Sequence, residues 1–274
     1  MSDCVSNVGQ KQLLTISIVT FNPDFAQLRK TLSSLSTALG QLQTDSVCIT
    51  IIDNSIKDSI SAFIESNFEH LPIRVVHGQG NIGFGRAHNL TLDDMGEFHL
   101  ILNPDIELHP EALINACAFM EANPRCGLLT PHSQWPNGDR QYLCKRYPAV
   151  FDLLLRGFAP KALRSFFKKR LAHYEMQAET QEEIYWNPLI ISGCFMFFRS
   201  HVLKQTNGFD EAYFLYFEDF DLSLRVHDFA DIAYVPNISI IHAGGHAAKK
   251  GMWHINTFVR SSMLFYRNHG LKII

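Results

Sequence analysis

The chain has 274 residues, of which 46% are hydrophobic and 19% are charged, so it is a globular protein and not a disordered one. Its formal net charge of -3 gives no overall electrostatic reason to bind nucleic acid. Six scattered cysteines without a CxxC pair favour a reducing, cytoplasmic compartment. No stretch approaches the length of a membrane span, so we expect a soluble or peripheral protein.

Apolar runs alternate with segments of helical spacing through the first half of the chain. Residues 14–21, 47–52 and 73–76 are apolar or β-branched and predict strands, and the segments between the first and the third run predict helices. Such alternation predicts an α/β protein with a parallel sheet. The first strand stops at Asn22, and the second ends at Asp53.

The apolar run 100–102 breaks abruptly into Asn103-Pro104-Asp105. Because Pro104 lacks a backbone donor, the strand should end there and present Asp105 at its carboxyl edge, where open α/β sheets bind ligands. A helix is expected to follow directly from Pro110. If the strands that end at Asp53 and Asp105 are adjacent, the two carboxylates converge on one crevice. The alternative is that Asp105 is an ordinary turn residue.

A glycine-rich segment runs from Gly80 to Asn89 and leads into a helix expected from Arg86. Glycines there permit positive φ or a close backbone approach, and a helix amino terminus favours an anion. The GxGxxG spacing fails, and the segment does not follow the first strand, so it is not a dinucleotide fingerprint.

Residues 153–174 contain no acidic residue. They alternate leucine and phenylalanine with six basic residues, which are Arg156, Lys161, Arg164, Lys168, Lys169 and Arg170. This pattern predicts a pair of basic amphipathic helices suited to an anionic membrane surface. The alternative is a solvated helix pair that packs on the core.

The remaining acids lie in the second half of the chain. A buried strand is expected over 190–198, with Ser192-Gly193 at a point of close backbone approach. Farther along, three carboxylates lie within four positions at the start of a predicted helix, at Glu218, Asp219 and Asp221. They repel one another unless a cation, a metal or a protonation event relieves them, and the helix dipole lowers the pKa of Asp219.

Two short strands, expected over 232–235 and 238–241, lead into His242-Ala-Gly-Gly-His246. A lone histidine is more often structural than a ligand. His242 nevertheless terminates a strand in a glycine-rich turn, which makes it a candidate site residue.

Together these motifs resemble the family 2 inverting nucleotide-sugar glycosyltransferases, and more narrowly their bacterial rhamnosyltransferase branch. The resemblance runs from about Thr15 to Tyr266 and rests on seven motifs in order, at 19–22, 52–55, 81–89, 102–105, 192–193, 208–211 and 214–222. It implies a GT-A fold, which is a Rossmann-like, mostly parallel twisted sheet flanked by helices, with a basic helical insertion at 150–174 and a C-terminal helix. Within this single domain, residues 14–126 would bind the nucleotide sugar and residues 127–274 would bind the acceptor, after a flexible N-terminus at 1–13.

The resemblance also implies the donor-binding residues. Thr20, Phe21 and Asn22 would line the nucleotide pocket, and Asp53 would accept a hydrogen bond from the base. Asn103-Pro104-Asp105 occupies the place of the family's DxD motif, with Asn103 replacing the first acid. Asp105 would hold Mg²⁺ or Mn²⁺ on the donor diphosphate, and His242 matches a further metal ligand that tilts the choice to Mn²⁺. The other donor contacts would be Asn54, Asn81, Gly83, Phe84, Gly85, Asn89, Pro104, His246 and Lys249.

The Glu218-Asp219 pair matches the family's catalytic-base position, and Asp219 is the expected base. A carboxylate that removes the proton of the acceptor hydroxyl during in-line attack gives inversion without a covalent intermediate. Glu218, Asp221, Ser192, Gly193 and Arg225 would orient the acceptor or support the base. An exchange of roles between Asp219 and Asp221 stays open.

The resemblance implies transfer of L-rhamnose from dTDP-rhamnose to a glycan or a polyprenyl-diphosphate-linked sugar in O-antigen or capsule assembly. The segment 156–170 would then meet the lipid diphosphate at the inner face of the cytoplasmic membrane. Two alternatives are a transferase that uses a UDP-hexose or UDP-hexosamine, and a non-catalytic nucleotide- or sugar-binding module of the same fold. A nucleotidyltransferase is disfavoured, because residues 20–24 contain no glycine and no basic residue.

Overall fold

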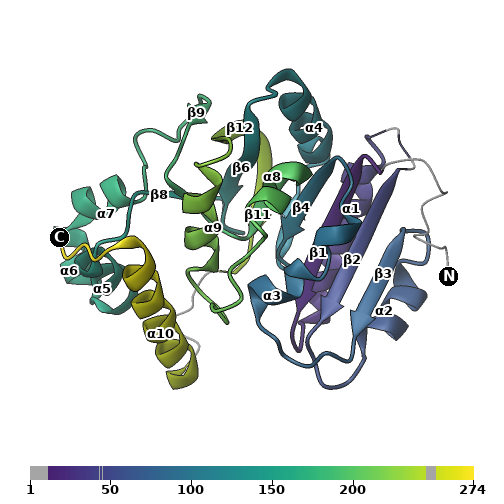
Figure 1. Cartoon of the computed structure of the whole chain (residues 1–274), viewed down its shortest axis with the longest axis horizontal. Helices are drawn as coiled ribbons and strands as arrows, with labels where there is room; N and C mark the ends of the chain where they lie inside the picture. Colours follow the sequence, from purple (N-terminus) through teal and green to yellow (C-terminus); the bar gives the residue numbers. More distant parts are fainter. Residues whose placement is uncertain (1–11, 43, 45, 245–250) are drawn as a thin grey trace.

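The computed structural model describes residues 12–42, 44, 46–244 and 251–274. The strands of its main sheet are β1 (Leu14–Thr20), β2 (Val47–Asp53), β3 (Ile73–His77), β4 (Phe98–Leu102), β5 (Ile106–Leu108), β6 (Cys126–Gln134), β7 (Arg140–Gln141), β9 (Tyr185–Trp186), β11 (Phe195–Arg199) and β12 (Asp231–His242). They run in the order β3-β2-β1-β4-β11-β6-β12-β5, with β7 beside β6 and β9 beside β12 (Figure 1). Two further strands, β8 (Cys144–Lys145) and β10 (Ile190–Ile191), pair with each other.

Helices flank this sheet and extend it at one end. They are α1 (Phe25–Leu39), α2 (Ile60–Asn67), α3 (Phe84–Asn89), the 3₁₀ turn η1 (Leu92–Asp94), α4 (Ala112–Ala122), α5 (Val150–Phe158), α6 (Lys161–Phe166), α7 (Lys168–Tyr174), α8 (Ser200–Gln205), α9 (Glu218–Val226) and α10 (Met252–His269). Figure 1 places α5, α6, α7, α10 and the C-terminus together at the end of the molecule opposite β3 and α2. None of the helices in the described ranges is long and apolar enough to cross a membrane.

The parallel strands of the first half bring two strand ends to one edge of the sheet. β1 lies between β2 and β4 and is parallel to both, with Thr20 opposite Asp53 and Ile18 opposite Leu102. Every residue of these three strands is buried, which explains their continuous apolar sequences. The strands that precede Asp53 and Asp105 are therefore separated by β1, and both end at the same edge.

The structure corrects five details of the sequence prediction. The single strand expected over 190–198 is two strands, β10 and β11, in different sheets, and the expected pair of basic helices is three helices, α5, α6 and α7. A short strand, β5, follows Asp105 before α4 begins, and it pairs with the end of β12 so that Ile106 lies opposite His242. The two predicted strands at 232–241 form one strand, β12, whose register shifts between Val235 and Ser239, around a proline that lacks a ladder donor. Helix α3 begins two residues earlier than expected.

Two buried histidines contact the amino-terminal half and the middle of β1. His99 contacts Thr15 Oγ1 through Nδ1 at 2.8 Å and Ser17 Oγ through Nε2 at 2.9 Å. The Nδ1 atom of His88 lies 2.7 Å from the same Ser17 hydroxyl. Burial lowers the pKa of His99 to about 3, and burial together with the nearby His99 lowers the pKa of His88 well below its usual value. Both imidazoles are therefore neutral at physiological pH.

Candidate active site

Asp53 is wholly buried at the end of β2, where three donors hold one of its carboxylate oxygens. Thr20 Oγ1 donates to Oδ1 at 3.0 Å, and the hydroxyl and amide of Ser55 donate to it at 2.6 and 3.1 Å. The other oxygen, Oδ2, has no hydrogen-bond partner in the described part of the chain. Because a buried carboxylate oxygen rarely stays unpaired, this atom is a ready acceptor for a ligand N–H.

The neighbouring loop is attached to this strand end. Asn54 Nδ2 donates to the carbonyl of Gly83 at 3.0 Å, and Gln79 Nε2 donates to Asn54 Oδ1 at 3.1 Å. Asn81 Oδ1 accepts from the amide of Gly83 at 3.2 Å. Gly83 has a φ of 93°, and a Cβ there would lie 2.4 Å from the carbonyl oxygen of Phe214, so the position requires glycine. Gln79, which sequence reasoning missed, adjoins the glycine-rich segment.

Three residues of the glycine-rich segment hold it against residues 208–214. Asn89 Nδ2 donates to the carbonyl of Phe209, and Asn89 Oδ1 accepts from its amide, both at 2.9 Å. The Phe84 ring lies 5.8 Å from the Phe209 ring, and a Cβ on Gly85 would come within 2.7 Å of the Phe209 side chain. Asn89, Phe84 and Gly85 were expected to contact the donor. These contacts fix the position of all three residues in the fold, and their contact with the donor stays a prediction.

Phe21 and Asn22 lie at the end of β1, where the strand leaves the sheet. The Phe21 ring is 51% exposed, so one face is free to stack on a ligand. Asn22 has a φ of 46°, and its amide donates to Ser55 Oγ at 2.8 Å. Together with Thr20 and Asp53, these residues form a compact group that could accept a nucleoside.

Asp105 and His242, which are far apart in sequence, meet at the same edge. His242 Nε2 lies 3.5 Å from Asp105 Oδ1, and the amide of Ala243 donates to the carbonyl of Asp105 at 3.1 Å. The Nδ1 atom of His242 contacts Gln141 Oε1 at 2.8 Å. Burial lowers the pKa of His242, but Cys194 and the hydrogen bond to Asp105 outweigh burial and raise it to about 10. No feature of the sequence pointed to Gln141 or Cys194.

The side chains around Asp105 fit a divalent cation. Asp105 Oδ1 and Asn103 Oδ1 are buried and have no hydrogen-bond partner within the described ranges. A Cβ at Gly244 would lie 1.9 Å from Asp105 Oδ2 and 3.2 Å from His242 Nε2, so only glycine lets these two side chains approach the backbone this closely. Carboxylate, amide and imidazole atoms are ligands that Mn²⁺ accepts. The described residues contain no cluster of three or more His, Cys, Asp or Glu side chains that could hold a metal ion.

The turn before α9 presents two acids. Tyr216 and Phe217 are consecutive non-glycine residues in the left-handed region, with φ of 71° and 67°, and α9 then begins at Glu218. Backbone strain of this kind is typical of functional sites. Asp219 Oδ2 accepts from the amide of Gly193 at 2.8 Å, and a Cβ at Gly193 would lie 3.0 Å from Asp219 Cβ. The expected close approach at Gly193 is therefore present, and its partner is Asp219.

The two neighbouring acids have raised pKa values, which corrects the expectation that the helix dipole lowers the pKa of Asp219. Burial raises the pKa of Asp219 to about 6, although the backbone N–H groups of Gly193 and Phe220 lower it in part. Burial, followed by the charge of Asp219, raises the pKa of Glu218 well above its usual value. Asp219 is therefore mostly ionised at pH 7 with a pKa close to that pH, which suits a general base.

Asp221 contacts two basic side chains on the other side of α9. Its Oδ2 accepts from Arg225 Nε at 2.8 Å, and its Oδ1 lies 2.7 Å from His269 Nε2 on α10. Arg225 also donates to the carbonyl of Thr206 at 2.6 Å. Asp221 and Arg225 therefore brace α9, and this arrangement favours Asp219 over Asp221 as the base. Sequence reasoning missed His269. This residue lies in the last turn of α10, outside every motif of the sequence analysis.

Backbone contacts join the segments that carry Asp219 and Asp105. The amide of Asn103 donates to the carbonyl of Cys194 at 2.9 Å, directly beside the Gly193 that binds Asp219. The amide of Ser192 donates to the carbonyl of Leu143 at 3.0 Å, and the carbonyl of Pro104 accepts from Thr31 Oγ1 at 2.8 Å. Two other expected site residues, His246 and Lys249, lie outside the described residues.

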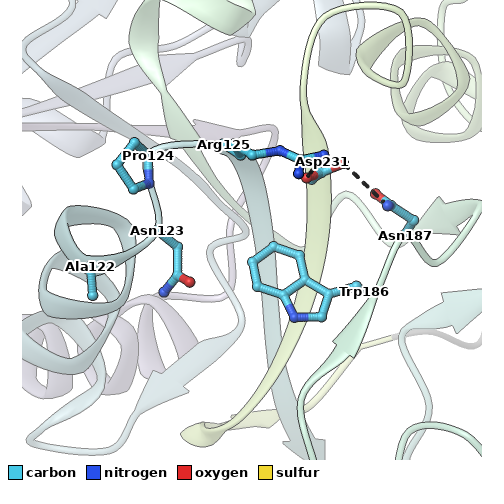
Figure 2. Close-up of a pocket in the computed structure, with 7 residues that line it drawn as sticks. All are labelled: Ala122, Asn123, Pro124, Arg125, Trp186, Asn187 and Asp231. Carbon is cyan, nitrogen blue, oxygen red and sulfur yellow. Dashed lines mark hydrogen bonds and ion pairs between the residues drawn. The ribbon is translucent and has the colours of Figure 1, made fainter.

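A separate hollow of about 370 Å³ lies at the amino ends of β6 and β12 (Figure 2). Asp231 there pairs with Arg125 at 3.1 Å and accepts from Asn187 Nδ2 at 3.2 Å. The other lining residues are Ala122, Asn123, Pro124 and Trp186. Because none of the expected site residues lines this hollow, the candidate active site is the opposite, carboxyl edge of the strands.

No family model matches the sequence. The N-acetylglucosaminyl-diphospho-decaprenol L-rhamnosyltransferase of two Mycobacterium tuberculosis strains is 26% identical in an alignment 274 residues long. The alignment covers 92% of this chain and 83% of the relative. Rhamnosyltransferase WbbL of Escherichia coli K12 is 24% identical over 238 residues, which cover 81% of this chain and 85% of the relative. These similarities confirm the expected resemblance to rhamnosyltransferases.

Solved structures share the fold. GalNAc-T7 with UDP, GalNAc and Mn²⁺ aligns with a TM-score of 0.61 at 16% identity, over 85% of this chain, which spans 43% of that one. Staphylococcus aureus TarS 1-349 in complex with UDP aligns with a TM-score of 0.56 at 16% identity, over 96% of this chain and 68% of that one. The GT-A fold expected from the sequence is confirmed.

Proposed function

We propose that this chain, which is a family 2 rhamnosyltransferase-like glycosyltransferase with the GT-A fold, transfers L-rhamnose from dTDP-L-rhamnose to a sugar carried on a polyprenyl diphosphate. The relatives support the sugar and the acceptor class. The observation that carries the proposal is the meeting of Asp53, the Asp105–His242 pair and Asp219 at one edge of the sheet.

The nucleoside would bind at the end of β1 and β2. The unpaired Oδ2 of Asp53 would accept the N3–H of the base, and Phe21 would stack on the base. Thymine and uracil present the same N–H donor to this acceptor. The choice between a dTDP and a UDP donor therefore depends on contacts to the thymine methyl group and to the ribose.

Asp105 and His242, with Asn103, are the residues that would hold a divalent cation. When bound, such a cation neutralises charge that develops on the departing nucleoside diphosphate. The orphaned oxygens of Asp105 and Asn103 support this role. Gln141 would fix the orientation of the His242 ring, as a hydrogen-bond partner behind a ligating histidine does in general.

Asp219 would act as the general base. Its carboxylate takes the proton of the acceptor hydroxyl while the hydroxyl oxygen attacks the anomeric carbon, and the bond from that carbon to the diphosphate oxygen breaks. The products are the glycoside, whose anomeric configuration is inverted, and dTDP. The Gly193 amide holds the carboxylate in place, and Glu218, which lies beside it, would contact the acceptor.

The acceptor class puts the reaction in cell-surface polysaccharide assembly, at the inner face of the cytoplasmic membrane. The basic segment 156–170 was expected to face the lipid. In the structure Arg170 pairs with Asp152 at 2.5 Å and Arg156 with Glu175 at 3.2 Å, so these two arginines are engaged within the fold. Lys161, Arg164, Lys168 and Lys169 are exposed and would face the lipid phosphates.

Calorimetric titration of dTDP and UDP, with and without Mn²⁺, tests the donor site. We expect metal-dependent binding of dTDP that is lost in Asp105→Ala and kept in Glu111→Ala, which removes an exposed carboxylate six positions farther along. Preference for UDP would move the donor to a hexose or a hexosamine. Absence of binding under every metal condition would contradict the proposed function.

A further inference from the structure

The surface formed by α5, α6, α7, α10 and the C-terminal residues is unusually apolar. Nineteen large apolar side chains are exposed in the described part of the chain, and ten of them lie within 150–174 and 251–274. The ten are Leu154, Leu163, Phe166, Met252, Trp253, Val259, Met263, Leu271, Ile273 and Ile274. Concentration of this kind marks an interaction surface, because single exposed apolar residues are normally scattered.

Two acid-free segments, far apart in sequence, build this surface together. Residues 153–174 and 232–274 contain no aspartate or glutamate. The amides of Val150 and Phe151 donate to the carbonyls of Lys272 and Ile273 at 2.9 and 3.1 Å, which attaches the C-terminal residues to the start of α5. Figure 1 shows the helices of both segments at the same end of the molecule. The basic segment predicted from the sequence is thus one part of a larger face.

Basic residues alternate with the apolar ones on this face. Seven are exposed without an ion-pair partner in the described residues, namely Lys161, Arg164, Lys168, Lys169, Arg260, Arg267 and Lys272. On α10 the exposed apolar positions Met252, Val259 and Met263 recur at helical spacing, and the opposite face is buried through Ser261 and Phe265. A helix with basic and apolar side chains on its solvent face is typical of an interfacial membrane helix.

We propose that α10 and the C-terminal residues 270–274 insert into the surface of an anionic lipid bilayer, with the basic residues of α6 and α7 binding the lipid phosphates. Charge complementarity selects this occupant, because seven unpaired cations with no acid between them would repel a second copy of the face. This inference deepens the proposed function, because a lipid-linked acceptor is met at the bilayer surface.

The same helix contacts the segment that leads into α9 and Asp219. Trp253 lies 5.8 Å from Phe214, whose carbonyl accepts from the amide of Phe84 at 3.0 Å. Tyr216, in the strained turn before α9, contacts His254 Nδ1 through its hydroxyl at 2.8 Å. Met252 lies eight positions after Gly244, which is beside Asp105, and such a length of chain spans at most about 30 Å. A bilayer-bound α10 therefore keeps the Asp105 edge near the membrane surface.

Sedimentation with vesicles of phosphatidylglycerol and phosphatidylcholine tests the proposal. Leu271→Ser with Ile273→Ser and Ile274→Ser should weaken binding about tenfold, whereas Ile56→Ser with Leu90→Ser and Ile114→Ser, which alter equally apolar exposed positions elsewhere, should leave it unchanged. Lys168→Glu with Lys169→Glu should weaken binding by a similar factor, and Lys57→Glu with Lys204→Glu should not.

Tryptophan fluorescence locates the inserted helix. Vesicles should shift the emission of the wild type to the blue, Trp253→Phe should abolish the shift, and Trp186→Phe should retain it. The proposal is overturned if the wild type does not bind these vesicles, if the tail variant binds as its control does, or if the variants change only self-association in size-exclusion chromatography. Calorimetric binding of dTDP, measured on every variant, separates a failure of this surface from a failure of the donor site.

Discussion

The two halves of the sheet build their site residues in different ways. In residues 14–126, here called the donor half, Asp53 is oriented by neighbours at the ends of adjacent regular strands. In residues 127–274, the acceptor half, Asp219 follows a strained turn and is oriented by Gly193, 26 positions away in the chain. Local strand geometry therefore orients Asp53, whereas tertiary contacts orient Asp219; that the two halves bind donor and acceptor is our proposal. Mutations should accordingly affect donor affinity in one half and the rate of transfer in the other.

The largest expected effect is that of Asp219→Asn. Loss of the general base should lower kcat about 10³-fold, because positioned general-base catalysis contributes roughly 10²–10⁴-fold. The affinity for dTDP should stay unchanged, since Asp219 belongs to the acceptor half. Steady-state kinetics with calorimetry checks both. Asp221→Asn is the matched control, and a larger loss of kcat in that variant would assign the base to Asp221.

The corresponding change in the donor half is Asp53→Asn. The variant replaces a charged acceptor by an amide of the same shape, and a hydrogen bond to a charged group contributes about 2 kcal/mol, or roughly 30-fold in affinity. We expect that loss in dTDP affinity, with kcat within a factor of about two at saturating donor. Asp58→Asn, which alters an exposed acid after the same strand, serves as the control. A fall in kcat with unchanged affinity for dTDP would contradict the division into a donor half and an acceptor half.

The pH dependence of transfer should report Asp219. Its pKa is raised to about 6 mainly by burial, and the base works only when ionised. As pH falls through about 6, kcat/KM should therefore drop, approaching tenfold per pH unit. Initial rates between pH 5 and 8, with circular dichroism to verify folding, measure this. A rate that stays constant down to pH 5 would exclude Asp219 as the titrating base.

The free energy of unfolding should depend on pH through His99, which lies in the donor half. Burial lowers the pKa of His99 from 6.5 to about 3, so the folded state holds this imidazole neutral while the unfolded chain protonates it below 6.5. The stability that the neutral ring provides is complete above pH 6.5 and is lost as pH falls, by about 1.4 kcal/mol per pH unit. Urea unfolding between pH 7 and 5 measures the slope. His99→Gln should reduce the slope by about that amount, with the contribution of the buried His88 remaining, and an unchanged slope would contradict the assignment.

The donor half was largely predictable from the sequence because its candidate site residues lie at the ends of strands. The apolar runs before Asn22, Asp53 and Asp105 have strong periodicity, and their breaks fix the edge of a parallel sheet. The contact between Asp105 and His242 followed from the family resemblance, and the register of β5 on β12 explains it.

The acceptor half was less predictable because residues of the same type that lie close together in sequence have different partners. Asp219 and Asp221 are two positions apart, and only the fold brings Gly193 to the first and His269 to the second. The side-chain amide of Asn89 pairs with the backbone of Phe209, 120 positions away, and nothing in the glycine-rich segment predicts this contact. Contacts of this range leave no periodic pattern in the sequence.

The stereochemistry of transfer tests the central claim most directly. The wild type would be incubated with dTDP-L-rhamnose, Mn²⁺ and a polyprenyl-diphosphate-linked N-acetylglucosamine, and the anomeric configuration of the product determined by NMR. We predict a rhamnoside whose configuration is opposite to that of the donor, and no product from Asp219→Asn in the same time. A rhamnoside with the donor's configuration would contradict direct displacement assisted by Asp219.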